Sequence, residues 1–357
     1  MSSSSLHVGI LTGGGDCPGL NAVIRGVTNS LIKTVGARVT GIERGFMGMI
    51  ERRSRPLDSE AVAGILNQGG TILGTHNFAN PFSCNGVDVS DKVMEYVREL
   101  GLDALVAIGG DGTMSIANRF TPLGLPVVGV PKTIDNDLMH TERTFGFDSA
   151  VAIVAEALAR LETTARSHGR VMVLETMGRY AGWIALEGGL AGGADVILIP
   201  EKPYDLNEVI RVCKEREKKQ GYTLICIAEG ARPIDGGMVV AKHLENSPDP
   251  IRLGGVGNVL RQQLEQHLES EVRTTQLGHV QRGGTPTPYD RVLATRFGWY
   301  AAKMVANGEF GRMVALKGDE CTSVPIEEVA NRTRNVPENH SLLDVATSLG
   351  VSLGLPA

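Results

Sequence analysis

Short apolar runs recur along the chain, and stretches with an apolar face of helical period separate them. Runs of about four to eight apolar residues predict buried strands, and the helical period predicts amphipathic helices. Strands are predicted at Val8–Thr12, Arg38–Ile42, Ala104–Ile108, Pro126–Val130, Arg170–Leu174, Asp195–Ile199, Thr223–Ile227, Val272–Gln276 and Met313–Leu316. Helices are predicted at Leu20–Lys33, Asp91–Leu100, Met114–Phe120, Ser149–Thr164, Leu206–Lys219, Gly255–His267 and Pro288–Asn307.

This alternation of strands and helices predicts an α/β fold with doubly wound, mostly parallel sheets. The strand candidates are almost continuously apolar, which fits strands that are covered on both faces. The chain has 357 residues, so two domains are expected. The polar stretch Glu245–Asp249 predicts a surface loop, and the tail Arg332–Ala357 contains a short apolar helix candidate. Ligands of such folds bind beyond the carboxyl ends of the strands.

Composition narrows the class of protein. The 45 glycines cluster where predicted strands end, which lets the backbone approach a ligand such as a phosphate. The net charge is −5 and no basic stripe is present, so a nucleic-acid partner is not expected. No signal peptide and no apolar run of about 20 residues is seen, so no membrane span is expected. Five cysteines without a C-x-x-C spacing indicate a reduced, cytoplasmic protein.

Two glycine-rich segments follow predicted strands. Thr12–Asn21 contains three successive glycines and leads into a helix, an arrangement that binds anions through backbone N–H groups. The alternative is a tight turn without a ligand, and no Gly-Lys-Ser/Thr follows to make a Walker A loop. Gly109–Thr113 places Asp111 at a strand end, where its carboxylate can hold Mg²⁺. The alternative is that Asp111 only caps the next helix.

Three further segments carry charged side chains. Pro131–Asp137 brings a cation, a hydroxyl and two carboxylates together; one carboxylate can act as a general base and the other can support a metal. A polar surface loop is the alternative. Met177–Gly182 and Leu277–Pro286 each place an arginine beside glycine, and arginine is suited to binding phosphate. The alternatives are surface salt bridges for the arginines and a structural role for His279.

Together and in this order, these segments resemble the family of 6-phosphofructokinases, from about Val8 to Gly311. PKTIDND, MGRYAG and LGHVQRGG are each close to diagnostic of that family. GGDGT is also found in NAD kinases and diacylglycerol kinases, which lack the other three segments. The resemblance implies Mg²⁺-dependent transfer of the γ-phosphoryl group of ATP to the 1-hydroxyl of fructose 6-phosphate, giving fructose 1,6-bisphosphate in glycolysis.

The resemblance also implies roles for individual residues. Asp135 would be the base, Thr133 would contact the transferred group, and Arg179 would stabilise its charge. The residues that would hold the donor phosphates are Gly15, Gly110, Asp111, Gly112, Thr113 and Lys132. Asp111 and Asp137 would hold Mg²⁺. The remaining substrate-binding residues would be Met177, Gly178, Glu229, His279 and Arg282, with Arg170 and Arg273 reaching into a neighbouring subunit. A homo-oligomer with shared active sites, a tetramer or a dimer, is therefore implied.

The identity of the donor depends on a few positions. Glycine at 112 leaves room for a nucleotide's α-phosphate, whereas family members that use pyrophosphate carry aspartate there. Lys132 favours pyrophosphate, because ATP-dependent bacterial enzymes carry glycine at that position. The glycine–lysine pair resembles a mixed branch in which ATP is expected. Asn77 replaces a family arginine in the loop Gly69–Phe78, and Lys132 is a candidate to supply that charge.

Three alternatives stay open from the sequence. One is a pyrophosphate-dependent fructose 6-phosphate 1-phosphotransferase, the second is a NAD or lipid kinase, and the third is a sugar-phosphate sensor without catalysis. By resemblance, a larger donor-binding domain would take residues 1–146 and 281–331. A smaller sugar-phosphate-binding domain would take 147–280 and 332–357, with the active site in the cleft between the two.

Overall fold

The computed structural model describes residues 5–243 and 251–356, and its strands form two main sheets. The larger sheet has the order β13-β12-β5-β4-β1-β2-β3. Its strands are β1 (His7–Thr12), β2 (Arg38–Ile42), β3 (Ser54–Leu57), β4 (Ala104–Gly109), β5 (Val127–Pro131), β12 (Arg312–Lys317) and β13 (Glu320–Pro325). The strands from β2 to β12 are parallel to their neighbours, and β3 and β13 are antiparallel edge strands.

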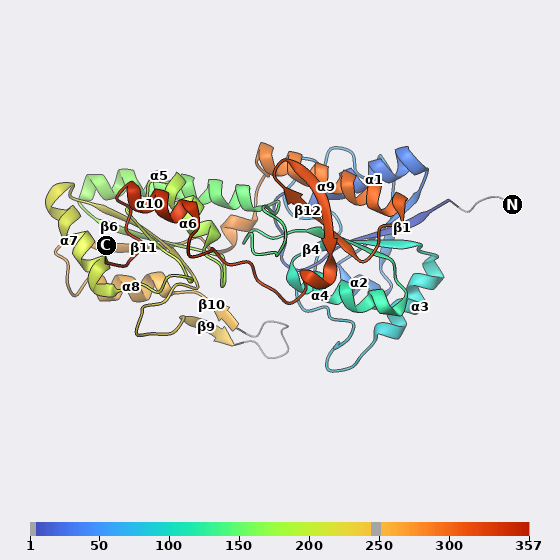
Figure 1. The fold of residues 1–357 in the computed structure, drawn as a ribbon, viewed down its shortest axis with the longest axis horizontal. Helices are drawn as coiled ribbons and strands as arrows, with labels where there is room; N and C mark the ends of the chain where they lie inside the picture. Colours follow the sequence, from blue (N-terminus) through green and yellow to red (C-terminus); the bar gives the residue numbers. More distant parts are fainter. Residues whose placement is uncertain (1–4, 244–250, 357) are drawn as a thin grey trace.

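Helices cover both faces of this sheet (Figure 1). α1 (Leu20–Val35) and α9 (Pro288–Asn307) lie on one face. The other face carries α2 (Phe46–Glu51), α3 (Ser90–Leu100) and α4 (Asp111–Phe120). α1 and α9 approach closely because each has a glycine at the contact: a Cβ on Gly26 would lie 3.0 Å from the Thr295 carbonyl oxygen. All residues of β1, β4 and β5 are buried, as strands between two helical layers require.

The smaller sheet has four parallel strands in the order β11-β6-β8-β7. These are β6 (Val171–Thr176), β7 (Val196–Leu198), β8 (Thr223–Ala228) and β11 (Val272–Gln276). One face packs against α5 (Phe147–His168) and α6 (Trp183–Ala191), and the other packs against α7 (Leu206–Lys219) and α8 (Val256–Leu264). α10 (Ser341–Ser348) contacts α6, and β9 (Val240–His243) and β10 (Ile251–Leu253) form a separate antiparallel pair.

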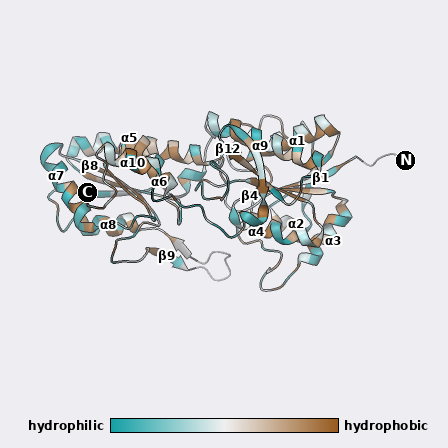
Figure 2. Ribbon diagram, in the orientation of Figure 1, coloured by the Kyte–Doolittle hydropathy of each residue, from teal (hydrophilic) through white to brown (hydrophobic). Residues whose placement is uncertain are grey.

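The chain passes between the two sheets repeatedly. It leaves the larger sheet after β5, returns after β11 through the 3₁₀ helix η2 (Gly278–Arg282), and leaves again after β13 through η3 (Ile326–Glu328). Figure 2 shows apolar strands inside both halves and polar outer helix faces. Within the described ranges, no helix is long and apolar enough to cross a membrane.

The predicted fold class is confirmed, and every predicted strand and helix is present with small shifts of its ends. The edge strands β3 and β13, the pair β9 and β10, and helices α2 and α6 were not predicted. The tail helix candidate corresponds to α10. The predicted loop at Glu245–Asp249 lies outside the described residues. The proposed domain boundaries remain a prediction.

Candidate active site

The glycine turn after β1 is held at the sheet edge by neighbouring loops. The Gly13 N–H donates to the Ile108 carbonyl at 2.9 Å, and the Thr75 hydroxyl donates to the Gly14 carbonyl at 2.5 Å. A Cβ on Gly13 would lie 2.5 Å from the Thr113 hydroxyl oxygen, so only glycine fits between these loops. The turn thus lies against the end of β4 and the beginning of α4.

The loop after β4 begins helix α4 at Asp111. The N-cap residue is Gly110, and no side chain caps this helix. Instead, the Asp111 carboxylate accepts hydrogen bonds from the Asn331 N–H at 2.6 Å and from the Ser115 hydroxyl at 3.4 Å. Burial raises the pKa of Asp111, and those hydrogen bonds partly oppose the rise. The alternative of Asp111 as the N-cap is therefore wrong.

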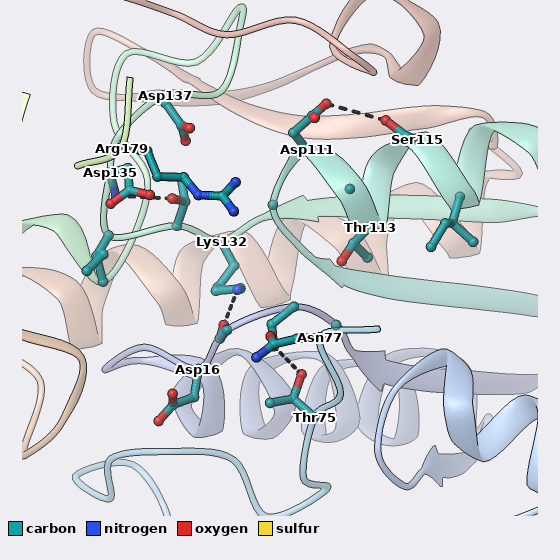
Figure 3. Close-up of a pocket in the computed structure, with 18 of the residues that line it drawn as sticks. Asp16, Thr75, Asn77, Asp111, Thr113, Ser115, Lys132, Asp135, Asp137 and Arg179 are labelled. Carbon is teal, nitrogen blue, oxygen red and sulfur yellow. Dashed lines mark hydrogen bonds between the residues drawn. The ribbon is translucent and has the colours of Figure 1, made fainter. Parts of the chain in front are cut away.

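The loop after β5 carries Thr133 together with Lys132, Asp135 and Asp137, the three that Figure 3 labels. The Lys132 ammonium donates to the Gly15 carbonyl, which joins this loop to the first glycine turn. The Asp135 N–H donates to the Thr133 hydroxyl at 3.0 Å. Asp135 is buried, and its Oδ1 has no hydrogen-bond partner among the residues that the structure describes.

Burial dominates the titration of this loop. It raises the pKa of Asp135. It raises the pKa of Asp137 to about 7, and the neighbouring Asp135 carboxylate adds to the rise. Burial lowers the pKa of Lys132. In each group burial disfavours the charged form, because the charge loses its contact with water. An anionic ligand or a cation in the cleft would therefore change the protonation of all three groups.

The smaller sheet contributes the opposite wall of the cleft. Arg179 follows β6 in a left-handed conformation, with φ of 50°, and its N–H donates to the Glu229 carboxylate at 3.1 Å. Burial raises the pKa of Glu229 to about 7, and the charge of Asp135 adds to the rise. Figure 3 shows the Arg179 guanidinium directed into the space near Asp111 and Asp137.

Arg282, from η2, crosses to the glycine turn. Its Nη1 donates to the Asp16 carbonyl at 3.5 Å, and its buried Nε has no partner within the described parts of the chain. The guanidinium lies directly over Gly15, where a Cβ would be 1.6 Å from Nη1. A residue predicted for the sugar phosphate therefore lies against a residue predicted for the donor.

One cavity of about 760 Å³ brings most of the predicted site residues together. The predicted residues that line it are Gly15, Gly110, Asp111, Gly112, Thr113, Lys132, Thr133, Asp135, Asp137, Met177, Arg179, Glu229, His279 and Arg282. Gly178 is next to the lining residues but is not one of them. The alternatives of a ligand-free turn, a polar surface loop and isolated surface arginines do not fit this convergence.

Arg170 and Arg273 do not line the cavity. Arg170 precedes β6 and Arg273 lies in β11, and both form ion pairs with Glu271. Arg170 is thus at the amino end of β6, whereas the cavity lies beyond the carboxyl ends of the strands. In a single chain these two arginines are separated from the site.

Several lining residues were not predicted. Asp16, Thr75, His76, Ser115, Tyr180 and Asn331 belong to this group. Thr75 and His76 directly precede Asn77 in the loop that resembles a donor loop of the family, so the sequence had pointed to this loop. Asn331 had no signal, because the polar segment around it contains no recognisable motif. In the part of the chain that the structure describes, no cluster of three or more His, Cys, Asp or Glu side chains is placed to hold a metal.

The protein has two α/β halves around a cleft, and the cleft contains glycine turns, buried carboxylates and cations. This combination defines a phosphotransferase that acts on small molecules. The sequence profile described as "Phosphofructokinase" matches residues 7–305, and the chain belongs to this family.

Some relatives that are similar to this chain are named for ATP, and others are named for pyrophosphate. It is 50% identical over 356 residues to "ATP-dependent 6-phosphofructokinase 2" of Clostridium perfringens, covering 97% of each chain. It is 50% identical over 332 residues to "Pyrophosphate--fructose 6-phosphate 1-phosphotransferase" of Streptomyces coelicolor, covering 93% of this chain and 96% of the relative. The phosphofructokinase structure from Saccharomyces cerevisiae matches with a TM-score of 0.76 and 30% identity. That match covers 90% of this chain and 45% of the yeast chain, so this chain spans less than half of the yeast protein's length.

Proposed function

We propose that this protein transfers the γ-phosphoryl group of ATP to the 1-hydroxyl of fructose 6-phosphate, giving fructose 1,6-bisphosphate. The observation that carries the proposal is the buried Asp135 carboxylate, whose Oδ1 has no partner among the described residues and which lines the same cavity as Arg179. A buried, unpaired carboxylate oxygen is suited to accept a proton from an alcohol. The cation opposite is suited to the negative charge of a phosphoryl group in transfer.

The larger sheet would bind the donor. Backbone N–H groups of Gly15, Gly110, Gly112 and Thr113 would hold the donor phosphates, because these residues line the cavity near the beginning of helices α1 and α4. Lys132 would add a positive charge beside the glycine turn. Thr133 would contact the transferred group, since it lines the cavity next to Asp135.

Asp111 and Asp137 are the residues that would hold Mg²⁺. Mg²⁺ in such sites is generally bound by one or two carboxylates together with substrate phosphates, so two carboxylates are sufficient. Both line the cavity, and burial raises both pKa values, so a divalent cation would offset the cost of their charges. When bound, the metal would neutralise charge on the donor phosphates.

The smaller sheet would bind the sugar phosphate. Met177, Gly178 and Glu229 would contact the sugar, and His279 and Arg282 would bind the sugar and its 6-phosphate. Arg179 would stabilise charge on the moving phosphoryl group. The positions of the arginines support this assignment, because an acidic protein must concentrate cations locally to bind two phosphorylated substrates.

Assembly and domain division are part of the same proposal. Arg170 and Arg273 lie away from the cavity of their own chain, which supports their use in the site of a neighbouring subunit in a dimer or tetramer. The donor domain would be residues 1–146 and 281–331, and the sugar-phosphate domain would be 147–280 and 332–357. We place the protein in the cytoplasm.

A pyrophosphate-dependent reaction is the second candidate, favoured by Lys132 and by the similarity to the Streptomyces coelicolor enzyme. ATP is favoured by the size of the cavity and by Gly112, where a Cβ would meet no atom within 4 Å. That open space at the beginning of α4 is where a longer donor would need room.

The experiment is an assay of the purified protein with fructose 6-phosphate, Mg²⁺ and either ATP or pyrophosphate. We expect fructose 1,6-bisphosphate with ATP and much slower formation with pyrophosphate. Asp135→Ser should lower turnover by about 10²–10⁴-fold while leaving sugar phosphate binding nearly intact. Faster reaction with pyrophosphate would assign the second candidate, and turnover of Asp135→Ser within a few-fold of the parent would remove Asp135 as the base.

A further inference from the structure

The chain between η3 and α10 crosses the cleft and contacts both halves of the site. We call residues 331–336 the strap (Figure 1, the orange-to-red chain between the two halves). At its beginning, the Asn331 N–H donates to the Asp111 carboxylate at 2.6 Å. At its end, the Val336 N–H donates to the Glu201 carboxylate at 2.8 Å, which also accepts from the Gly182 N–H at 2.9 Å. The strap therefore connects the start of α4 to the loop before α6.

Arg334, in the middle of the strap, holds the loop that carries Asp135. Its backbone N–H donates to the Asp137 carbonyl at 2.7 Å, and its Nη1 donates to the Asn136 carbonyl at 3.0 Å. Asn136 has a left-handed backbone with φ of 53°, and its side-chain oxygen accepts from the Thr144 N–H at 3.0 Å. This conformation, uncommon for a residue other than glycine, is thus fixed from two sides, directly after Asp135.

The same arginine contacts the opposite wall. Its guanidinium lies 4.2 Å from the centre of the Trp183 ring, and the Trp183 Nε1–H donates to the Arg334 carbonyl at 2.9 Å. Trp183 is buried and begins α6, directly after the loop that contains Arg179. Arginine combines a flat face for stacking with N–H groups in a rigid fork, so one side chain fixes both loops at once.

We propose that Arg334 is a positioning residue for phosphoryl transfer, one that holds the Asp135 loop in register with the Arg179 loop across the cleft. The inference rests on the proposed function, because it assigns the base and the cation to these two loops. Arg334 does not line the cavity, so it acts through Asn136, Asp137 and Trp183 rather than on the substrate. Positioning matters here because a misplacement of about 1 Å can cost about 10²-fold in rate.

The kinetic test compares Arg334→Met with Arg160→Met, an exposed arginine on α5 whose replacement changes the net charge equally. We expect Arg334→Met to lower kcat by about 10- to 100-fold, with both KM values within about threefold of the parent. Arg160→Met should match the parent. A folded Arg334→Met enzyme with parental kcat would overturn the inference, as would a loss confined to KM.

Amide hydrogen exchange gives a readout that needs no substrate. In Arg334→Met, amides of residues 133–137 should exchange at least about tenfold faster, while those of β1 and β4 stay protected. Unchanged exchange in the loop would overturn the inference. If the parent itself makes no fructose 1,6-bisphosphate, the proposed function fails, and exchange still decides whether Arg334 fixes the loop. Should Arg334→Met not fold, Arg334→Lys, which keeps the charge and loses the planar stack, is measured in its place with the same expected directions.

Discussion

Arg282 lies so close to Gly15 that a methyl group on residue 15 would stand 1.6 Å from its Nη1. This contact joins η2 to the glycine turn after β1, although the two residues are far apart in the sequence. The residues that we propose to bind the donor and the sugar phosphate therefore lie against each other.

Gly15→Ala tests this contact. The methyl group must displace the end of a flexible side chain, so the variant should fold while Arg282 moves away from its position. We expect kcat/KM for fructose 6-phosphate to fall by about 10- to 100-fold, the loss of one charged hydrogen bond. The matched control is Gly237→Ala, where a Cβ meets no atom within 4 Å. Equal kinetics in the two variants would contradict the role assigned to Arg282.

Lys132→Ala tests whether this ammonium replaces the charge that is missing at Asn77. Lys132 is 4% exposed and donates to the Gly15 carbonyl, so it lies where donor phosphates would approach. Its removal should raise the donor KM by about tenfold or more and leave the KM for fructose 6-phosphate almost unchanged. Steady-state kinetics measure both, with the exposed Lys317→Ala as control. If the donor KM stays constant and only the melting temperature falls, Lys132 stabilises the fold by its hydrogen bond to Gly15 and does not bind the donor.

Gly112→Asp tests donor choice. A side chain at this position points into open space, so the fold should tolerate it. The added carboxylate would repel a polyphosphate and fill the region of the α-phosphate. We expect kcat/KM for ATP to fall by about 100-fold or more, with a smaller effect on pyrophosphate. Gly112→Ala separates bulk from charge. A parallel loss with both donors would show that residue 112 does not discriminate between them.

Asp290 predicts a pH dependence of stability. This buried residue of α9 accepts from the Ser149 N–H at 2.8 Å and from the Ser149 hydroxyl at 2.6 Å. Burial raises its pKa from the ordinary 3.8 to about 6, with the nearby charge of Asp148 adding to the rise. The folded state binds this proton more tightly than the unfolded state does. The contribution of the proton to the free energy of unfolding is therefore fully present below about pH 4 and is lost as pH rises through 6.

Asp290→Asn removes this titration. The melting temperature of the variant relative to the parent should therefore rise by a few degrees between pH 4.5 and 7.5, as the parent loses on the order of 2 kcal/mol. Thermal unfolding at several pH values measures the difference. Exposed Asp319→Asn should show no such trend. A difference that stays flat with pH would mean that Asp290 titrates normally.

The sequence predicted the loops of the site well because parallel strands end at one edge of a sheet. Asp111 and Asp135 follow β4 and β5, so the convergence of their loops could be expected from the strand pattern. Helix α6 was not predicted because Trp183–Ala191 is almost entirely apolar and lacks a polar face with helical period. Edge strands β3 and β13 are partly exposed and carry several polar residues, so they lack the apolar run of a central strand.

The contribution of the tail could not be predicted from local pattern. Asn331 contacts Asp111 across a separation of 220 residues, and nothing in the polar segment around it indicates a partner. The same holds for Arg334 and Trp183. Their contact depends on the path of the strap across the cleft and not on the local sequence around either residue. Such contacts follow from the topology of the fold. Residue propensities and hydrophobic periodicity describe short segments of sequence and do not indicate which distant segments meet.

The repeated passage of the chain between its two sheets has a consequence for dissection of the protein. Neither half is encoded by one continuous stretch, so no single truncation can yield an isolated lobe with its core complete. A protease cut at any one passage would leave the lobes covalently connected through the remaining ones. Nicked protein should therefore migrate as one native species and separate into fragments only under denaturing conditions.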